Sequence, residues 1–222
     1  GAQKREPMPF RQALPLRPRD PRKVLPGSTP IPKAPTPGTL TALTLKGPLL
    51  VTAILAGAKR CENRSWQIQP GWYALHLGSG EASEKEEAAW RTQCSASEDA
   101  NPPVPPGIGS SALPPRACIV GAICIGQSTK VVSTGAADIS TGGWSAEGWA
   151  VGPRVHRITH VAPLPTGIRE TGIRGELSLW SVASEKTAGL AVAKSVCHAI
   201  ETFLTSNAQL AGNDEIISKY FK

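Results

Sequence analysis

Prolines crowd the first forty residues, and they limit where this chain can form a packed domain. Residues 1–40 contain ten of the 21 prolines and a single aromatic residue, Phe10. Proline lacks a backbone donor, and it pushes the residue before it toward extended geometry. Such a segment cannot bury enough apolar surface to offset its chain entropy. We therefore expect residues 1–40 to form an extended, polyproline-like arm and the folded domain to begin after it.

The positive charge of the chain lies in the same arm. Residues 1–40 hold eight basic and two acidic groups, which gives +6 of the net +7, and the other 182 residues carry 16 basic and 15 acidic groups. Basic arms of this kind are typical of segments that follow RNA or run across a large assembly. The expected arm contacts are Lys4, Arg5, Arg11, Arg17, Arg19, Arg22, Lys23 and Lys33.

Short apolar segments separated by glycine and proline follow the arm and predict an α+β fold. A short helix is expected between Pro48 and Gly57, because proline suits the first helical turn and glycine suits the left-handed end. Strands are expected at residues 39–45, 71–78, 117–127, 154–164 and 175–182.

Two further helices and one insertion are expected outside these strands. Residues 81–91 form a polar helical pattern, and the proline-rich residues 92–116 predict a long loop, so an insertion spans about 81–116. A C-terminal helix begins near Ser184, followed by a polar tail to Lys222. Its expected apolar face consists of Leu190, Ala193, Val196, Cys197, Ile200, Phe203 and Leu204.

Composition and spacing argue against several classes of protein and site. No apolar run approaches the roughly 18 residues of a membrane span. Five cysteines without C-x-x-C or zinc spacing favour a reducing compartment and no metal. His156 and His160 share a strand face by spacing, but no acidic or cysteine partner stands nearby in sequence. No nucleotide-binding or nucleophile-elbow motif occurs, so we expect no cofactor.

The start at Gly1 predicts either an engineered end or a mature end left by removal of a targeting peptide.

The most informative motif is the charged stretch ILAGAKRCENRSW, which ends at Trp66. In a strand, Arg60, Glu62, Arg64 and Trp66 would lie on one face. One hypothesis is that an Arg–Glu pair holds the preceding helix against the sheet. The other is that Lys59 and Arg64 contact phosphate while Trp66 offers a stacking face.

Tryptophans dominate the aromatic content of the chain. Trp72 and Trp180 sit in apolar strand segments and are expected in the core. Trp144 and Trp149 lie in the glycine-rich stretch STGGWSAEGWAVGPR, where they either cover a base or pack onto the barrel as a lid.

The stretch also resembles a known family. Gly57, Lys59, Glu62 and Arg64 match the G-x-K-x-x-E-x-R signature of the ASCH domain, a member of the PUA-like superfamily. The segments GWYALHLG, PPRACIVGAICIG and GIRGELSLWSV resemble the strands that follow in that family. The resemblance runs from about residue 43 to residue 182.

The resemblance implies a small mixed β-barrel with flanking helices and a cleft beside the signature. The domain would span residues 41–182, after the arm at 1–40 and before a C-terminal helix and tail at 183–222. Family members are thought to bind RNA or modified nucleosides. The expected nucleic-acid-binding residues are Lys59, Glu62, Arg64, Trp66, His76, Trp144 and Trp149.

One bacterial branch of the family deacetylates acetylated cytidine with a lysine, a threonine three residues later and a distal glutamate. The lysine would be Lys59, but Glu62 replaces the threonine, and the central strand offers only Ala122, Ile123 and Cys124 where the glutamate belongs. If the protein were an enzyme, Lys59 and Glu62 would be its catalytic pair. We expect a binding function without catalysis.

These observations lead to three hypotheses. The first is a non-enzymatic RNA-binding component of a larger ribonucleoprotein, such as the mitochondrial ribosome, with structured or ribosomal RNA and neighbouring proteins as partners. The second is a structural accessory subunit of an organellar complex with a vestigial cleft. The third is an amidohydrolase acting on acetylated cytidine nucleosides. The expected location is mitochondrial, with chloroplast or cytoplasm as alternatives.

Overall fold

The computed structural model describes residues 31–55, 57, 59–85, 88, 116–130, 152–164, 175, 178–184 and 189–207, and the backbone of 208–220. The elements in chain order are η1 (Pro37–Thr39), β1 (Thr41–Leu45), α1 (Pro48–Leu55), β2 (Cys61–Arg64), β3 (Gly71–Leu77), β4 (Cys118–Lys130), β5 (Arg154–Pro163), β6 (Trp180–Ser181) and α3 (Gly189–Tyr220).

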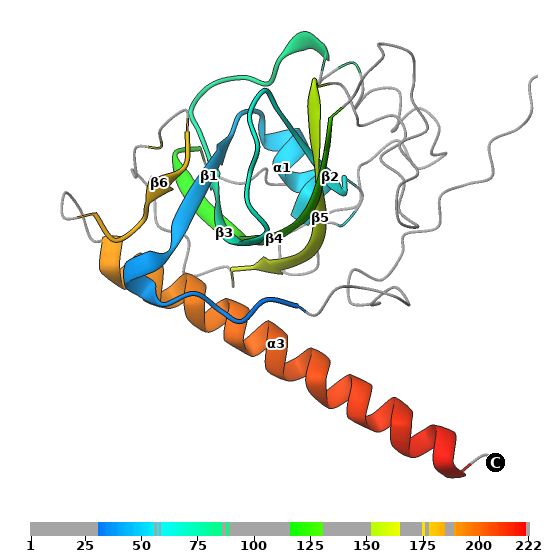
Figure 1. The fold of residues 1–222 in the computed structure, drawn as a ribbon. Coiled ribbons are helices and arrows are strands. Elements are labelled where there is room, and N and C mark those ends of the chain that lie inside the picture. The colour runs from blue at the N-terminus through cyan, green and yellow to red at the C-terminus, as the bar shows by residue number, and fades with distance from the viewer. Residues whose placement is uncertain are drawn as a thin grey trace, which may run out of the picture.

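The strands form one mixed, curled sheet with the order β2-β5-β4-β3-β1-β6. β1 runs parallel to β3, and the other neighbouring strands pair antiparallel. Figure 1 shows α1 within the curl of the sheet and α3 along its outer side. The structure therefore confirms the expected α+β class with a curled mixed sheet and helices against it.

The central strands are buried on both sides, which explains their nearly continuous apolar sequences. One face of β3 contributes Tyr73, Leu75 and Leu77 to an inner cluster with α1, and the other contributes Trp72 and Ala74 to an outer cluster with α3. The inner cluster also includes Leu43, Leu45, Val51, Ile54, Leu55, Ile68, Cys118, Val120, Ile123, Ile125, Ile158 and Val161. Two packed faces make this sheet the middle layer of the domain.

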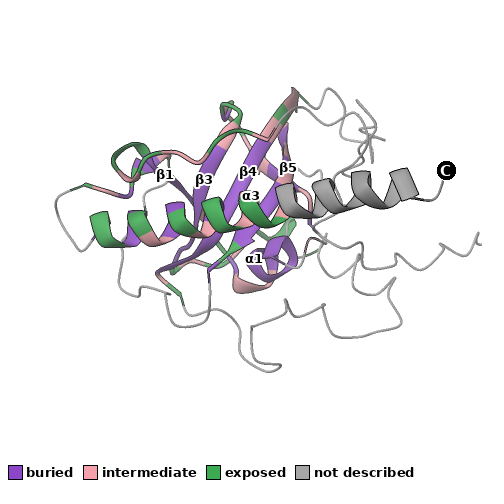
Figure 2. Cartoon of the chain, turned by 90° about the horizontal axis from the view of Figure 1, so that it is seen from below, coloured by how far each residue is buried: buried purple, intermediate pink, exposed green. Residues whose placement is uncertain are grey.

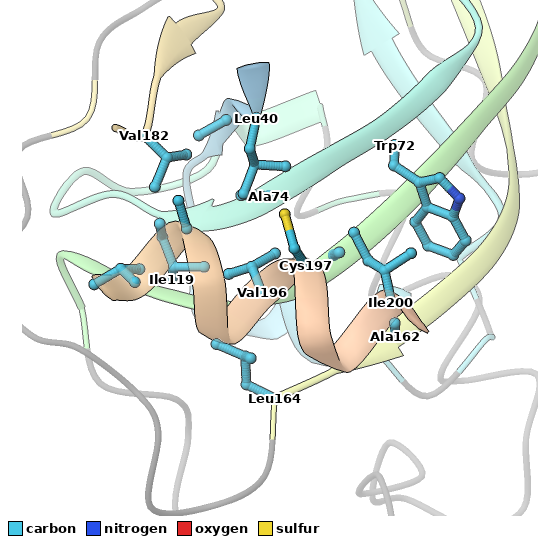
Figure 3. Close-up of a cluster of buried hydrophobic side chains, with 14 of the residues drawn as sticks. Leu40, Trp72, Ala74, Ile119, Ala162, Leu164, Val182, Val196, Cys197 and Ile200 are labelled. Atoms are coloured by element: carbon cyan, nitrogen blue, oxygen red, sulfur yellow. The ribbon is translucent and has the colours of Figure 1, made fainter. Parts of the chain in front are cut away.

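α3 covers the outer face of the sheet with its apolar stripe (Figures 2 and 3). The buried members of that stripe are Val192, Ala193, Val196, Cys197 and Ile200. Phe203 and Leu204 are partly buried and pack against the same cluster. The expected face is confirmed from Ala193 to Leu204. Its first expected member, Leu190, is 50% exposed, and Val192, which was not expected there, is buried.

The segment before β1 also lies on this outer side. The indole Nε1 of Trp72 donates to the carbonyl of Pro32 at 2.9 Å, and Ile31 and Ala34 pack against the outer cluster. η1 contacts α3. The last ten residues of the predicted arm are therefore held on the domain, while residues 1–30 lie outside the described part of the chain.

Several predicted elements are found close to their expected bounds, including α1, β3, β4 and β5. Among the described residues of the predicted strand at 175–182, Trp180 and Ser181 are the ones in a strand. Trp72 and Trp180 are buried, as expected, and so are Cys118 and Cys124. Residues 84 and 85 are helical, but most of the predicted insertion lies outside the described residues.

Candidate nucleic-acid interface

The signature begins where α1 ends and the chain turns into β2. Gly57 has φ +74°, a backbone conformation that favours glycine, and its N–H donates to the carbonyl of Ile54 at 2.9 Å. The N–H of Lys59 donates to the carbonyl of Ala53 at 3.0 Å. This closed turn directs the Lys59 side chain back toward the first residues of β2.

Lys59 is enclosed rather than exposed, with 1% of its surface accessible. Its Nζ donates to the carbonyl of Cys61 and to Glu62 Oε2, the latter at 3.2 Å. Glu62 is also buried, at 3% exposure, and its Oε1 lies 3.0 Å from Arg64 Nε. That second contact is electrostatic, because Arg64 Nε has no aligned hydrogen bond. One carboxylate therefore lies between two cations.

Arg64 connects β2 to a distant strand and to an aromatic ring. Its Nη2 donates to the carbonyl of Thr44 in β1 at 2.6 Å. Its guanidinium carbon lies 5.8 Å from the centroid of the Trp66 ring, within the range of a cation–π contact. The Arg64 side chain is 19% exposed, and Trp66 is half-buried against the inner cluster. Lys59 and Glu62 are buried, whereas Arg64 and Trp66 reach the surface.

Thr44 links the signature to a second buried group on β1, β3 and β6. Its Oγ1 accepts a hydrogen bond from Trp180 Nε1 at 2.9 Å and lies 3.2 Å from His76 Nδ1. The rings of His76 and Trp180 meet edge to face at 5.4 Å between centroids. His76 is 1% exposed. Thr44 connects it to Arg64 of the signature, and its buried side chain does not reach the surface.

His156 is a site residue that sequence reasoning passed over. It lies directly opposite Glu62 in the β2–β5 ladder, and its Nε2 donates to the carbonyl of Trp66 at 3.0 Å. Its Nδ1 has no hydrogen-bond partner within the described structure. Only the strand pairing shows this role, because His156 is 90 residues from Trp66 in sequence.

Burial lowers the pKa of His156, since the charged imidazolium loses its hydration. The hydrogen bond to Trp66 and the charge of Glu62 act in the opposite direction, and the charges of Arg154 and Arg64 add to the lowering of the pKa. His156 therefore favours the neutral state, which suits a fixed donor to the carbonyl of Trp66.

The expectation that His156 and His160 share a face is wrong. The β4–β5 register shifts between Cys124–His160 and Ile125–Ile158, so the two histidines point to opposite sides. His160 lies near Trp72 and Phe203 in the outer layer. Among the described residues there is no group of three histidine, cysteine, aspartate or glutamate side chains that could hold a metal ion.

The other predicted contacts lie mostly beyond the described chain. Trp144, Trp149 and the basic residues of 1–30 fall outside it, whereas Lys33 is described and exposed. No helix in the described part is long and apolar enough to cross a membrane. Compared with known proteins, the sequence matches no family model and no curated protein.

The buried and the partly exposed members of this group differ in what they can contact. Lys59 and Glu62 are enclosed and bonded to each other, so a substrate cannot reach either group in this conformation. Arg64 and Trp66 present a cation and an aromatic surface; Glu62 contacts the Arg64 side chain, and His156 holds the backbone carbonyl of Trp66. A guanidinium and an aromatic face are the groups that recognise phosphates and bases of unpaired RNA.

Proposed function

We propose that this protein is a non-enzymatic, PUA-like RNA-binding component of a larger ribonucleoprotein, and that Arg64 and Trp66 form its contact surface on the folded domain. The observation that supports this most is the Arg64–Trp66 pair, partly exposed and fixed by buried partners. A base stacks on the guanidinium plane or on the open part of the indole, while Arg64 also attracts phosphate. The match of Gly57, Lys59, Glu62 and Arg64 to the ASCH signature agrees with this proposal.

Within this proposal, Lys59 and Glu62 support the contact surface and do not touch RNA. A fixed guanidinium loses less conformational entropy on binding than a free one. The ion pair to Glu62 and the hydrogen bond to Thr44 provide that preorganisation. The basic arm then adds sequence-independent contacts to phosphate.

The test is binding of fluorescein-labelled single-stranded RNA followed by anisotropy at several salt concentrations. We expect Trp66→Ala and Arg64→Gln each to weaken binding. Matched controls on α3 are Leu190→Ala and Lys194→Gln, which remove an exposed apolar side chain and an exposed charge far from the signature. Equal affinity for the four variants would overturn the proposed surface, and no RNA affinity at any salt would overturn the function.

The arm is tested separately by changing its seven basic residues in 1–30 to glutamine. This design keeps the contact between Pro32 and Trp72, which a deletion to residue 40 would remove. Each lost phosphate contact should reduce the slope of log affinity against log salt by about 0.7. An unchanged slope would assign the arm to protein contacts. The changed residues are Lys4, Arg5, Arg11, Arg17, Arg19, Arg22 and Lys23.

A second candidate is a structural accessory subunit, and α3 is the observation that favours it. Its described packing residues extend to Leu204, and the helix backbone continues to Tyr220 and projects past the sheet (Figure 1). Co-purification of tagged protein from mitochondria separates the two candidates. If the Arg64→Gln/Trp66→Ala protein still co-purifies with its complex, and a protein truncated after residue 207 does not, the structural subunit is favoured. The reverse outcome would favour RNA binding.

A further inference from the structure

Three basic residues stand next to one another across three strands at one end of the sheet. Arg64 of β2 pairs with Arg154 of β5, and Arg154 pairs in turn with Lys130 of β4. Directly paired residues of antiparallel strands point to the same face. We call this set the cationic row (Arg64, Arg154 and Lys130).

The charge of the row is not balanced by nearby carboxylates. β2, β4 and β5 together contain a single acidic residue, Glu62, which is already engaged by Lys59 and Arg64. Counting Lys59 with the row gives four cations against one anion, a local charge of +3. Within the described chain, the side chains of Arg154 and Lys130 make no ion pair or hydrogen bond. Like charges placed directly opposite each other destabilise a sheet, so this arrangement calls for an anionic ligand.

The row is also accessible to a ligand. Lys130 is exposed, and Arg154 and Arg64 are half-buried. In the β2–β5 ladder, Arg64 pairs with Arg154 two residues away from the pair of Glu62 and His156, so both arginines lie on the side of the sheet that carries Glu62. The cationic row therefore continues the Arg64–Trp66 surface onto β5 and β4.

We propose that the cationic row binds two or three successive phosphates of one RNA strand, whose base is held at Arg64 and Trp66. That the ligand is RNA rests on the proposed function above. The row adds how much of the strand is bound and in which direction it crosses the sheet. Neighbouring strands are about 4.8 Å apart, so the row spans roughly 10 Å. Phosphates follow one another at about 3.4 Å of axial rise in a stacked strand. A single nucleotide therefore reaches Arg64 but not Lys130.

The experiment compares a ten-nucleotide oligouridine with uridine monophosphate as probes, using the full chain. The variants are Arg154→Gln and Lys130→Gln, with Lys194→Gln as the matched loss of one exposed lysine and Arg154→Lys as the charge-preserving form. A phosphate contact with a salt slope of about 0.7 changes affinity about fivefold between 1 M and 0.1 M salt. We expect each row variant to lose about fivefold affinity for the oligonucleotide and to lower the slope by about 0.7. Arg154→Lys and Lys194→Gln should bind nearly as wild type.

Uridine monophosphate gives the second readout, because Lys130→Gln should not change its affinity. If Arg154→Gln and Lys130→Gln bind RNA like Lys194→Gln, while Trp66→Ala still weakens binding, the cationic row does not bind phosphate. The proposed function would then still stand. A wild-type protein that binds no oligonucleotide at low salt would overturn both. Competition by polyglutamate as strong as by RNA of equal charge would replace RNA with an acidic protein as the ligand of the row.

Discussion

Arg64 of β2 donates a hydrogen bond to the carbonyl of Thr44 in β1, although three strands separate β2 from β1 in the sheet. The contact is possible because the sheet curls, and it fixes the guanidinium that lies over Trp66. The same side chain thus serves the stability of the curled sheet and the proposed RNA surface. The two roles can be separated experimentally.

Replacing Arg64 with alanine should lower the free energy of unfolding by about 2 kcal/mol, since a hydrogen bond from a charged donor contributes about 1.5–3 kcal/mol. Arg64→Lys should lose less stability but should not restore the planar contact with Trp66. Urea denaturation gives the free energy, with Lys194→Gln as a control of equal charge. A stability unchanged by Arg64→Ala would show that the bond to Thr44 contributes nothing.

The buried pair of Lys59 and Glu62 should show strong coupling. Glu62→Gln leaves the Lys59 ammonium buried without its counter-charge, and breaking such a pair costs about 3–5 kcal/mol. Lys59→Met combined with Glu62→Gln should cost less than the sum of the single changes, because no uncompensated ammonium remains. The unfolding free energies of the wild type, the two single variants and the double variant are compared in a double-mutant cycle. Strict additivity would be inconsistent with the ion pair.

Gly175 should tolerate no side chain. A Cβ at this position would overlap His76 Nδ1 and Thr44 Oγ1, which lie 3.2 Å apart, and Thr44 Oγ1 also accepts a hydrogen bond from Trp180 Nε1. Gly175→Ala should therefore destabilise the protein by roughly 1–3 kcal/mol, the usual cost of overpacking. Gly38→Ala is the control, since a Cβ there meets nothing within 4 Å. Equal stability of the two variants would contradict the close approach of Gly175.

Stability should fall as the solution is acidified below the ordinary histidine pKa of about 6.5. Burial lowers the pKa of His156 in the folded state, so the unfolded chain binds its proton first as the pH falls. The stability that neutral His156 contributes is therefore present above pH 6.5, and it is lost as the pH falls from that value to the pKa of His156 in the folded protein. Burial lowers the pKa of His160 in the same direction, so a variant must isolate His156.

His156→Gln provides that isolation, because glutamine keeps a donor for the carbonyl of Trp66 and does not titrate. Melting temperatures of wild type and variant are compared from pH 8 to pH 5. The wild type should lose more stability on acidification than the variant. Parallel curves would show that His156 does not titrate in this range.

Hydrophobic periodicity and the positions of proline and glycine predicted the helices and strands well, because these signals are local in sequence. Pro48 and Gly57 mark the start of α1 and the turn after it, and the apolar run of β4 is buried on both faces. The predicted pair of Glu62 and Arg64 on one face of a strand is also found. Of the two hypotheses for the charged stretch, the first named an Arg–Glu pair, and Glu62 and Arg64 form one within β2. The second named Lys59 as a phosphate contact, but Lys59 is buried against Glu62.

What the sequence could not supply was the register between distant strands. His156 opposes Glu62, and Arg154 opposes Arg64, only because β2 pairs with β5, which lies 90 or more residues further along the chain. The local shift in the β4–β5 ladder likewise separates His156 from His160, against the simple alternation of a strand. The net charge of each segment also assigned the positive charge to the arm. It did not show the local excess of positive charge in the cationic row at the end of the sheet.

The most direct test of the central claim is ultraviolet cross-linking of the full chain to single-stranded RNA, with cross-linked peptides located by mass spectrometry. The account predicts cross-links in residues 61–70, which include Arg64 and Trp66, and in residues 152–157 beside Arg154. These cross-links should disappear in the Trp66→Ala/Arg64→Gln protein. Cross-links confined to residues 1–30, and unchanged in that variant, would contradict an RNA-binding surface on the folded domain.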